Sequence, residues 1–408
     1  MISFGYHFVS ARFSRLHGPA EVCDFDRTHD QNPVVQRGIP QLPCKETVLD
    51  ILSQQPLGDF VCSFNILHGG FMFDKLTENL GGIPGFNFRK MEIGGKMKNI
   101  CVPNKYMREL QSRFLSDLKD RVHAQKGNDF FALRKLLSAT GSVKGTNSMV
   151  NAQKHMGSNY FYITDLVKAF PNIDLERLAA LLIYIYKANY YRIEFDIRYI
   201  GQNYQRLFDD EDFQQTLVFL KRYLAGQYQQ GLAIGGPASP YLLNIYMEAY
   251  LDVHLRRFCE NNDKIVYTRY VDDLVFSRPV GFIGKDTRKA IRSIIERAGL
   301  KINHRKSKVL WFDIGQVAIT KTILSKSEDE VKLKYPQEKR RKLHGMIGSY
   351  LHMQMDHPEV VSGHIAGFLH YYKNVKKPTR TDEKTFSLCK RFEEAWTPYK
   401  SKHSYTKT

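Results

Sequence analysis

Residues 264–277 read KIVYTRYVDDLVFS, and they say more about the fold than any other part of the chain. Aromatic and β-branched residues flank the pair Asp272-Asp273 on both sides, which predicts two short strands, 264–270 and 274–277. A tight turn must join them, so the stretch forms a β-hairpin. The hairpin carries two carboxylates at its tip.

A second acidic position ends another expected strand. Residues 159–165 read NYFYITD, a run of aromatic and β-branched residues that closes at Asp165. Aspartate is unfavourable in strands, and three such acids close together would repel one another. A pair of hard divalent cations removes this conflict and supports nucleotidyl transfer to a 3′-hydroxyl. The alternative is three exposed turn acids, and an isolated Asp-Asp pair does not decide between the two.

Three further stretches surround these acids in the sequence. Asp165 begins DLVKAF and is followed by Pro171, residues 231–240 read GLAIGGPASP, and residues 299–307 read GLKINHRKS. Together with Tyr270-Val-Asp-Asp273 they resemble, in the same order, the motifs of reverse transcriptases. The resemblance covers roughly residues 85–375. It implies an α+β right-hand polymerase fold with an antiparallel palm sheet and a helical thumb, and an RNA-templated DNA polymerase.

The resemblance also implies the metal ligands. Asp165 and Asp272 would be the principal ligands of two Mg²⁺ ions, with Mn²⁺ as a substitute. Asp273 would be a weaker or structural third acid, and the carbonyl of Leu166 would add a ligand. Lys306 would donate a proton to the leaving pyrophosphate, and the alternative for it is a solvated lysine in a basic stretch.

Nucleotide contacts follow from the same motifs. The ring of Phe170 would occupy the space of a ribose 2′-hydroxyl and so select dNTPs, whereas the alternative is a core aromatic. Lys96 and Lys98 would hold the triphosphate. Ile234 and Gly235 stand in the motif that contacts the nucleotide–template pair. Many relatives carry Gln where Ile234 stands, and Ile is similar to the error-prone enzymes of diversity-generating elements, so we expect loose discrimination.

Residues 151–155, NAQKH, match the NAxxH signature of retron reverse transcriptases. The retron Val-Thr-Gly signature of the thumb is replaced by AITK at residues 318–321. A compact enzyme of this kind resembles bacterial retron-type or defence-associated (abortive-infection, unknown-group) reverse transcriptases. Such enzymes work with a noncoding RNA and protect against phage, so the expected partners are dNTPs, an RNA template and primer, a dedicated noncoding RNA and the DNA product.

The periodicity predicts helices at residues 105–137, 175–188, 239–259, 286–298 and 360–372, with a further strand at 308–312. Ser239-Pro240 is a favoured helix start. We expect an N-terminal extension of unclear role at residues 1–84. The fingers should comprise residues 85–160 and 176–230, and the palm residues 161–175 and 231–320. The helical thumb and the C-terminal tail should follow at residues 321–408.

Composition agrees with a nucleic-acid enzyme. The 408 residues include 60 Lys and Arg against 42 Asp and Glu, a net charge of +18 that favours phosphate binding. No run of 18 apolar residues predicts a membrane span. The six cysteines are widely spaced without a CxxC pair, which argues against a zinc site or a disulfide framework and favours the reducing cytoplasm.

Two alternatives stay open at this level. One is another chemistry on the same palm: an RNA-dependent RNA polymerase, or a template-independent or protein-primed nucleotidyl transferase. The other is a nucleic-acid-binding module that has lost catalysis, which the four intact residues Asp165, Asp272, Asp273 and Lys306 oppose. The sequence does not predict the oligomeric state.

Overall fold

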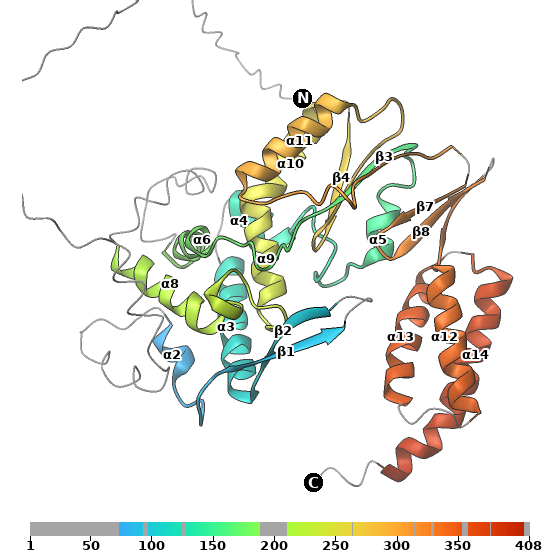
Figure 1. Cartoon of the computed structure of the whole chain (residues 1–408), viewed down its shortest axis with the longest axis horizontal. Helices are drawn as coiled ribbons and strands as arrows, with labels where there is room; N and C mark the ends of the chain where they lie inside the picture. The colour runs from blue at the N-terminus through green and yellow to red at the C-terminus, as the bar shows by residue number, and fades with distance from the viewer. Residues whose placement is uncertain are drawn as a thin grey trace, which may run out of the picture. The chain divides into compact units, whose positions relative to one another are not determined.

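The computed structural model describes residues 73–92, 97–124, 128–187, 210–262, 264–313, 315–327, 330–352, 358–375 and 377–403. The chain divides into two units, Met1–His68 and Gly69–Thr408. All described residues belong to the second unit, so the expected N-terminal extension lies outside them up to residue 72 (Figure 1).

The second unit is built around a four-stranded antiparallel sheet in the order β4-β5-β3-β6. Its strands are Val266–Tyr270, Asp273–Arg278, Tyr160–Asp165 and Lys308–Trp311. Alternation along β3 buries Tyr162 against one hydrophobic cluster and Phe161 against another. The predicted hairpin and the two predicted flanking strands are therefore confirmed, and they are neighbours in one sheet.

One face of this sheet is covered by α9 (Ser239–Met247), the π-helical turn η3 (Glu248–Asp252) and α10 (Val253–Asn261). Pro240 stands in the first turn of α9, as expected. With α11 (Lys285–Arg297) these helices run alongside β3 and β4 in Figure 1. The predicted single helix is thus confirmed in extent, but it contains a wider turn that the sequence pattern did not indicate.

A larger group of helices packs around the same hydrophobic cluster that contains Tyr162. It consists of α2 (Asp74–Thr77), α3 (Lys105–Ala124), α4 (Asn128–Lys135), α6 (Leu175–Lys187) and α8 (Glu211–Tyr223), followed by the short helix η2 (Gln227–Gln229). A separate two-stranded sheet pairs β1 (Phe86–Glu92) with β2 (Met97–Pro103). Acidic residues begin α8, where the Asp210 side chain caps the helix by accepting from the Phe213 amide.

The C-terminal part has its own hydrophobic cluster. A three-stranded antiparallel sheet comprises β7 (Gly315–Ile319), β8 (Thr322–Lys326) and β9 (Val331–Lys334), next to the short helix α5 (Ser148–Gln153). The helices α12 (Gln337–Leu351), α13 (Pro358–Asn374) and α14 (Arg380–His403) follow. The first of these helices starts at Gln337, because Thr322–Lys326 and Val331–Lys334 pair as strands.

Candidate active site

The turn between β4 and β5 consists of Val271 and Asp272. Register pairs Asp165 of β3 directly with Asp273 of β5. The amide of Leu166 donates to the carbonyl of Asp272 at 2.9 Å, which ties the end of β3 to the turn. As a result, one carboxylate oxygen from each of the three aspartates lies within 4.8 Å of the others. The structure thus brings together the three acids that the sequence placed in two separate stretches.

The electrostatics of this cluster are unfavourable for a set of bare carboxylates. Burial raises the pKa of Asp273 to about 6, and the charges of Asp272 and Asp165 add to the effect. Burial and Asp165 likewise raise the pKa of Asp272. Converging carboxylates, two of which have a raised pKa, fit hard divalent cations, which neutralise their charge.

Two side chains from the loop after α11 contact Asp165. The Lys306 Nζ lies 2.8 Å from the Asp165 Oδ2, and Asn303 donates to the same oxygen at 3.2 Å. The Asn303 amide also donates to the Asp165 carbonyl at 2.7 Å. Lys306 therefore contacts one of the three acids, and about half of its side chain is exposed.

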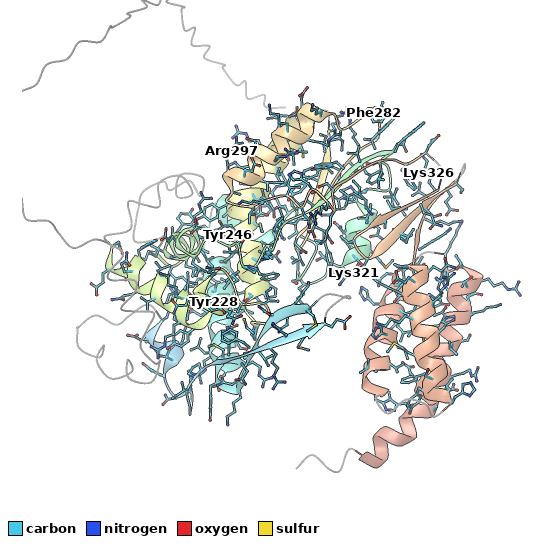
Figure 2. All side chains as sticks on the ribbon, viewed as in Figure 1. Tyr228, Tyr246, Phe282, Arg297, Lys321 and Lys326 are labelled. Carbon is cyan, nitrogen blue, oxygen red and sulfur yellow. The ribbon has the colours of Figure 1, made fainter. Side chains whose placement is uncertain are left out.

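Two further lysines act on the acids through their charge. Lys98 of β2 is exposed, and its charge offsets part of the rise in the pKa of Asp272. Lys321, which follows β7 and is labelled in Figure 2, carries a charge that offsets part of the rise in the pKa of Asp273. Its Nζ lies 5.7 Å from the centre of the Tyr270 ring. Lys321 ends the AITK stretch that replaces the Val-Thr-Gly signature of the thumb, and nothing in the sequence linked this stretch to the three acids. Lys96 lies outside the described residues.

Phe170 adjoins the glycine-rich motif. It is half-buried and packs against the main core, while its carbonyl accepts from the Leu232 amide at 2.8 Å. Gly231 has a φ of +52°, and a Cβ there would lie 2.4 Å from the Phe170 oxygen. The loop that carries Phe170 therefore contacts the glycine-rich motif directly. The order of the two segments in the sequence does not reveal this contact.

Ile234 and Gly235 connect this motif to β2. The carbonyl of Ile234 accepts from the Cys101 amide at 2.8 Å. Gly235 has a φ of +110°, and a Cβ would lie 2.6 Å from the Cys101 oxygen, so only glycine fits. This contact joins the β1–β2 sheet, which carries Lys98, to the motif.

The NAxxH stretch contacts the central sheet through His155. His155 is fully buried, with its Nδ1 2.6 Å from the Ser277 Oγ and its Nε2 2.7 Å from the Thr268 Oγ1. It therefore bridges β4 and β5 from within the core. Asn151 is also buried, and the nitrogen and oxygen of its side-chain amide have no hydrogen-bond partner among the described residues.

Comparison with known proteins settles the family. The family "Reverse transcriptase (RNA-dependent DNA polymerase)" matches residues 89–343, more than half of the chain. The chain belongs to the reverse transcriptase family. The matched span includes all three aspartates, Lys306 and the glycine-rich motif, so this reverse transcriptase carries the site just described.

Two curated relatives are retron reverse transcriptases of Escherichia coli. The Ec83 enzyme is 24% identical over 71% of this chain and 82% of its own length. The Ec86 enzyme is 23% identical over 61% of this chain and 65% of its own. Among solved structures, apo telomerase of Candida tropicalis aligns at 12% identity and a TM-score of 0.43, covering 78% of this chain and 59% of the telomerase. That overlap is too loose to support an inference.

The family match confirms three expectations. The fold is an α+β right-hand polymerase, the activity is RNA-templated DNA synthesis, and the enzyme is similar to retron reverse transcriptases. Within the described residues, none of the helices has both the length and the apolar character that crossing a bilayer requires. The cysteines among those residues, at positions 101, 259 and 389, are free and buried.

Proposed function

We propose that Asp165, Asp272 and Asp273 hold two Mg²⁺ ions while this reverse transcriptase adds dNTPs to a primer, and that Mn²⁺ can substitute. The single observation that carries the proposal is the approach of the three carboxylates to within 4.8 Å of one another. Such ions would activate the attacking 3′-hydroxyl and neutralise charge on the leaving pyrophosphate. The carbonyl of Leu166, which adjoins Asp165 in the chain, is the further ligand that we propose.

The residues around the acids would bind and orient the nucleotide. Lys98 and Lys306 supply positive charge on the side of Asp272 and Asp165, where a triphosphate needs it. We propose the proton-donor role for Lys306 as well. Phe170, seated on the glycine-rich motif, would exclude a 2′-hydroxyl, and Ile234 with Gly235 would line the nucleotide–template pair. We also propose that residues 85–160 and 176–230 form the fingers and that residues 161–175 and 231–320 form the palm.

The template is RNA, and we propose that it is a dedicated noncoding RNA with its own primer. The similarity to two retron reverse transcriptases supports this proposal. On the same ground we propose a cytoplasmic location and a role in defence against phage. Deleting the gene, or replacing it with an Asp272→Asn copy, should then raise phage plaque counts to the same level, and equal plaque counts with the intact gene would contradict the defence role.

Primer extension tests the enzyme directly. Purified protein is given Mg²⁺, a poly(rA) template with an oligo(dT) primer, and dTTP or UTP. We expect extension with dTTP and little with UTP. Asp272→Asn and Asp165→Asn should each abolish it, because each removes one of the converging charges. Asp120→Asn, which removes an exposed acid on α3, is the matched control and should retain full activity.

The outcomes separate the proposal from its rivals. Extension that survives in Asp272→Asn would overturn the metal assignment. Activity with UTP equal to that with dTTP would indicate an RNA product. Products that form without template, or that remain attached to the protein after nuclease treatment, would indicate untemplated or protein-primed synthesis on the same palm.

A further inference from the structure

The acidic turn adopts a conformation that its own residues do not favour. Val271 has a φ of +60°, in the left-handed region that β-branched side chains avoid. Strained backbone of this kind persists only where surrounding groups hold it. Since Asp272 and Asp273 follow Val271 directly, whatever holds this residue also sets the direction of the two carboxylates.

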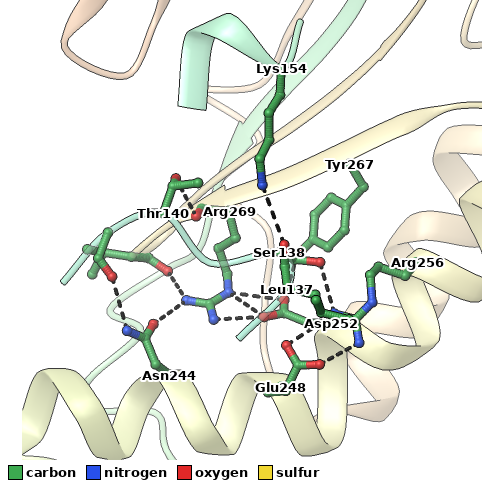
Figure 3. Close-up of polar contacts among 12 residues, drawn as sticks. Leu137, Ser138, Thr140, Lys154, Asn244, Glu248, Asp252, Arg256, Tyr267 and Arg269 are labelled. Carbon is green, nitrogen blue, oxygen red and sulfur yellow. Dashed lines mark hydrogen bonds and ion pairs between the residues drawn. The ribbon is translucent and has the colours of Figure 1, made fainter. Parts of the chain in front are cut away.

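Arg269, two residues before the turn, supplies one of these contacts. Its Nη1 donates to the carbonyl of Val271 at 3.0 Å, and the whole side chain is buried, with 0% of its surface exposed. The guanidinium is held in place by Asp252, which accepts from its Nε at 3.0 Å and its Nη2 at 2.7 Å (Figure 3). Asp252 is itself fully buried and also accepts from the Tyr267 hydroxyl at 2.7 Å.

Asn244 completes the network and reaches the other side of the turn. Its Oδ1 accepts from the Arg269 Nη1 and its Nδ2 donates to the Gly141 carbonyl, both at 3.0 Å (Figure 3). Gly141 lies against the turn: a Cβ on it would be 2.6 Å from the Val271 Cγ2 and 2.8 Å from the Val271 nitrogen. Val271 is therefore bonded at its carbonyl and confined at its side chain and amide.

The π-helical turn explains how both polar residues come from one helix. Asn244 and Asp252 are eight residues apart, and in an unbroken α-helix each step of four residues rotates the side chain by about 40°. The turn Glu248–Asp252 has i→i+5 bonding and holds more residues per turn, which offsets this drift. Both side chains consequently reach the same guanidinium.

We propose that the buried network of Asn244, Asp252 and Arg269 is a positioning device for the metal-binding turn: it holds Val271 in its left-handed conformation so that Asp272 and Asp273 are directed at the cations. A buried ion pair is weak grounds for expecting added stability, because desolvation offsets the attraction. The direct bond from Arg269 to the turn gives this pair a different purpose. The inference rests on the proposed metal site.

Mn²⁺ binding, measured by the electron paramagnetic resonance signal of free Mn²⁺, tests the inference without relying on activity. Asn244→Ala removes the bonds to Arg269 and Gly141, and Gly141→Ala presses on the turn from the opposite side while leaving the ion pair intact. Each should raise the Mn²⁺ Kd by roughly tenfold, the equivalent of one hydrogen bond to a charged group. In primer extension each should lower kcat, with the KM for dTTP changed by less than about twofold.

Glu248→Gln is the matched control. Glu248 lies on the same helix, is equally buried and pairs with Arg256, but it makes no hydrogen bond to the turn or to Gly141 (Figure 3). This variant should unfold at a lower temperature yet bind Mn²⁺ as the wild type does. Thermal unfolding of all three variants in EDTA shows whether they are folded.

Two results would overturn the inference. One is a folded Asn244→Ala protein with wild-type Mn²⁺ affinity; Asn244→Ser is measured beside it so that the conclusion does not depend on a single variant. The other is an equal loss of affinity in Glu248→Gln, which would show that general destabilisation is responsible. Absence of Mn²⁺ binding in the wild type, with Asp272→Asn behaving identically, would instead overturn the metal site on which the inference rests.

Discussion

Asp165 and Asp273 are directly paired residues on adjacent antiparallel strands, β3 and β5. Like charges in this position repel, and Asp272 lies beside them in the turn. The sheet therefore holds a local repulsion at the point where we propose that this reverse transcriptase binds cations. The same arrangement leads to opposite expectations for stability and activity.

Replacing Asp273 by Asn should stabilise the metal-free protein while impairing DNA synthesis. The amide has nearly the same shape but no charge, so the repulsion from Asp165 and Asp272 disappears. We expect a gain on the order of 1 kcal/mol in the free energy of unfolding, measured by urea denaturation in EDTA. Added Mg²⁺ should stabilise the wild type more than the variant. An Asn variant that is less stable than the wild type in EDTA would contradict this view.

Gly235 should not tolerate a side chain. Its φ is +110°, and a Cβ at this position would lie 2.6 Å from the Cys101 oxygen, so Gly235→Ala must displace β2. We expect a loss of roughly 1–3 kcal/mol in stability, together with weaker dTTP binding because Lys98 is on that strand. Gly345→Ala, in the middle of α12 with open space around it, should instead gain about 0.5–1 kcal/mol. Equal stability of the two variants would count against the close contact.

The buried imidazole of His155 should make stability depend on pH. Burial lowers the pKa of His155 from 6.5 to about 3, with the charge of Lys154 contributing. Below pH 6.5 the unfolded chain binds a proton that the folded chain does not, so stability falls as the pH drops from 6.5 towards 3. Between pH 7.5 and 5.0 this effect amounts to about 2 kcal/mol.

The control for that prediction is His155→Gln, compared by urea denaturation at both pH values. The variant lacks the titrating group, so its loss of stability between pH 7.5 and 5.0 should be smaller by about 2 kcal/mol. It should also be less stable at pH 7.5, since the bonds to Ser277 and Thr268 are disturbed. If the stability of the two proteins depended on pH in the same way, folding would not lower the pKa of His155.

Shortening Phe170 should admit ribonucleotides. In Phe170→Ala the space that we assign to the 2′-hydroxyl is vacated, so the ratio of kcat/KM for dTTP over UTP should fall by about 10- to 100-fold, mostly through better use of UTP. Single-nucleotide extension on poly(rA) measures this ratio. Phe258→Ala, which removes a partly buried ring from α10, is the control for lost packing. If the ratio of kcat/KM for dTTP over UTP were unchanged in Phe170→Ala, Phe170 would be a core aromatic and not a selector of dNTPs.

A substitution at Ile234 tests the expectation that this enzyme discriminates loosely between bases. Ile234→Gln introduces the side chain that the resemblance to reverse transcriptases leads us to expect here. The hydrogen bond from Cys101 to the Ile234 carbonyl is made by the backbone and so survives the change. We expect the frequency of misincorporation, measured by sequencing the products of one round of synthesis, to fall several-fold. Error rates that match in the two proteins would remove the hypothesis.

The fold family and the principal acids could be predicted from local sequence. The aromatic and β-branched residues in 159–165 and 264–277 indicate strands because such side chains fit a pleated, half-buried surface, and a turn with two acids stands out in such apolar surroundings. The long helix beginning at Ser239 was equally readable from its period and its Pro at the first turn. These are local properties, and neighbouring residues encode them.

The distant groups that act on those acids could not be predicted in this way. The charge of Lys321 near Asp273 and the bond from Arg269 to Val271 join residues whose positions depend on how strands and helices pack. The motif implied a role for Lys306, but its contact with Asp165 also appears only in the folded chain. Arg269 also reads as an ordinary strand residue until its guanidinium is found buried against Asp252, brought there by a π-helical turn. Packing geometry, rather than any pattern along the chain, makes these contacts.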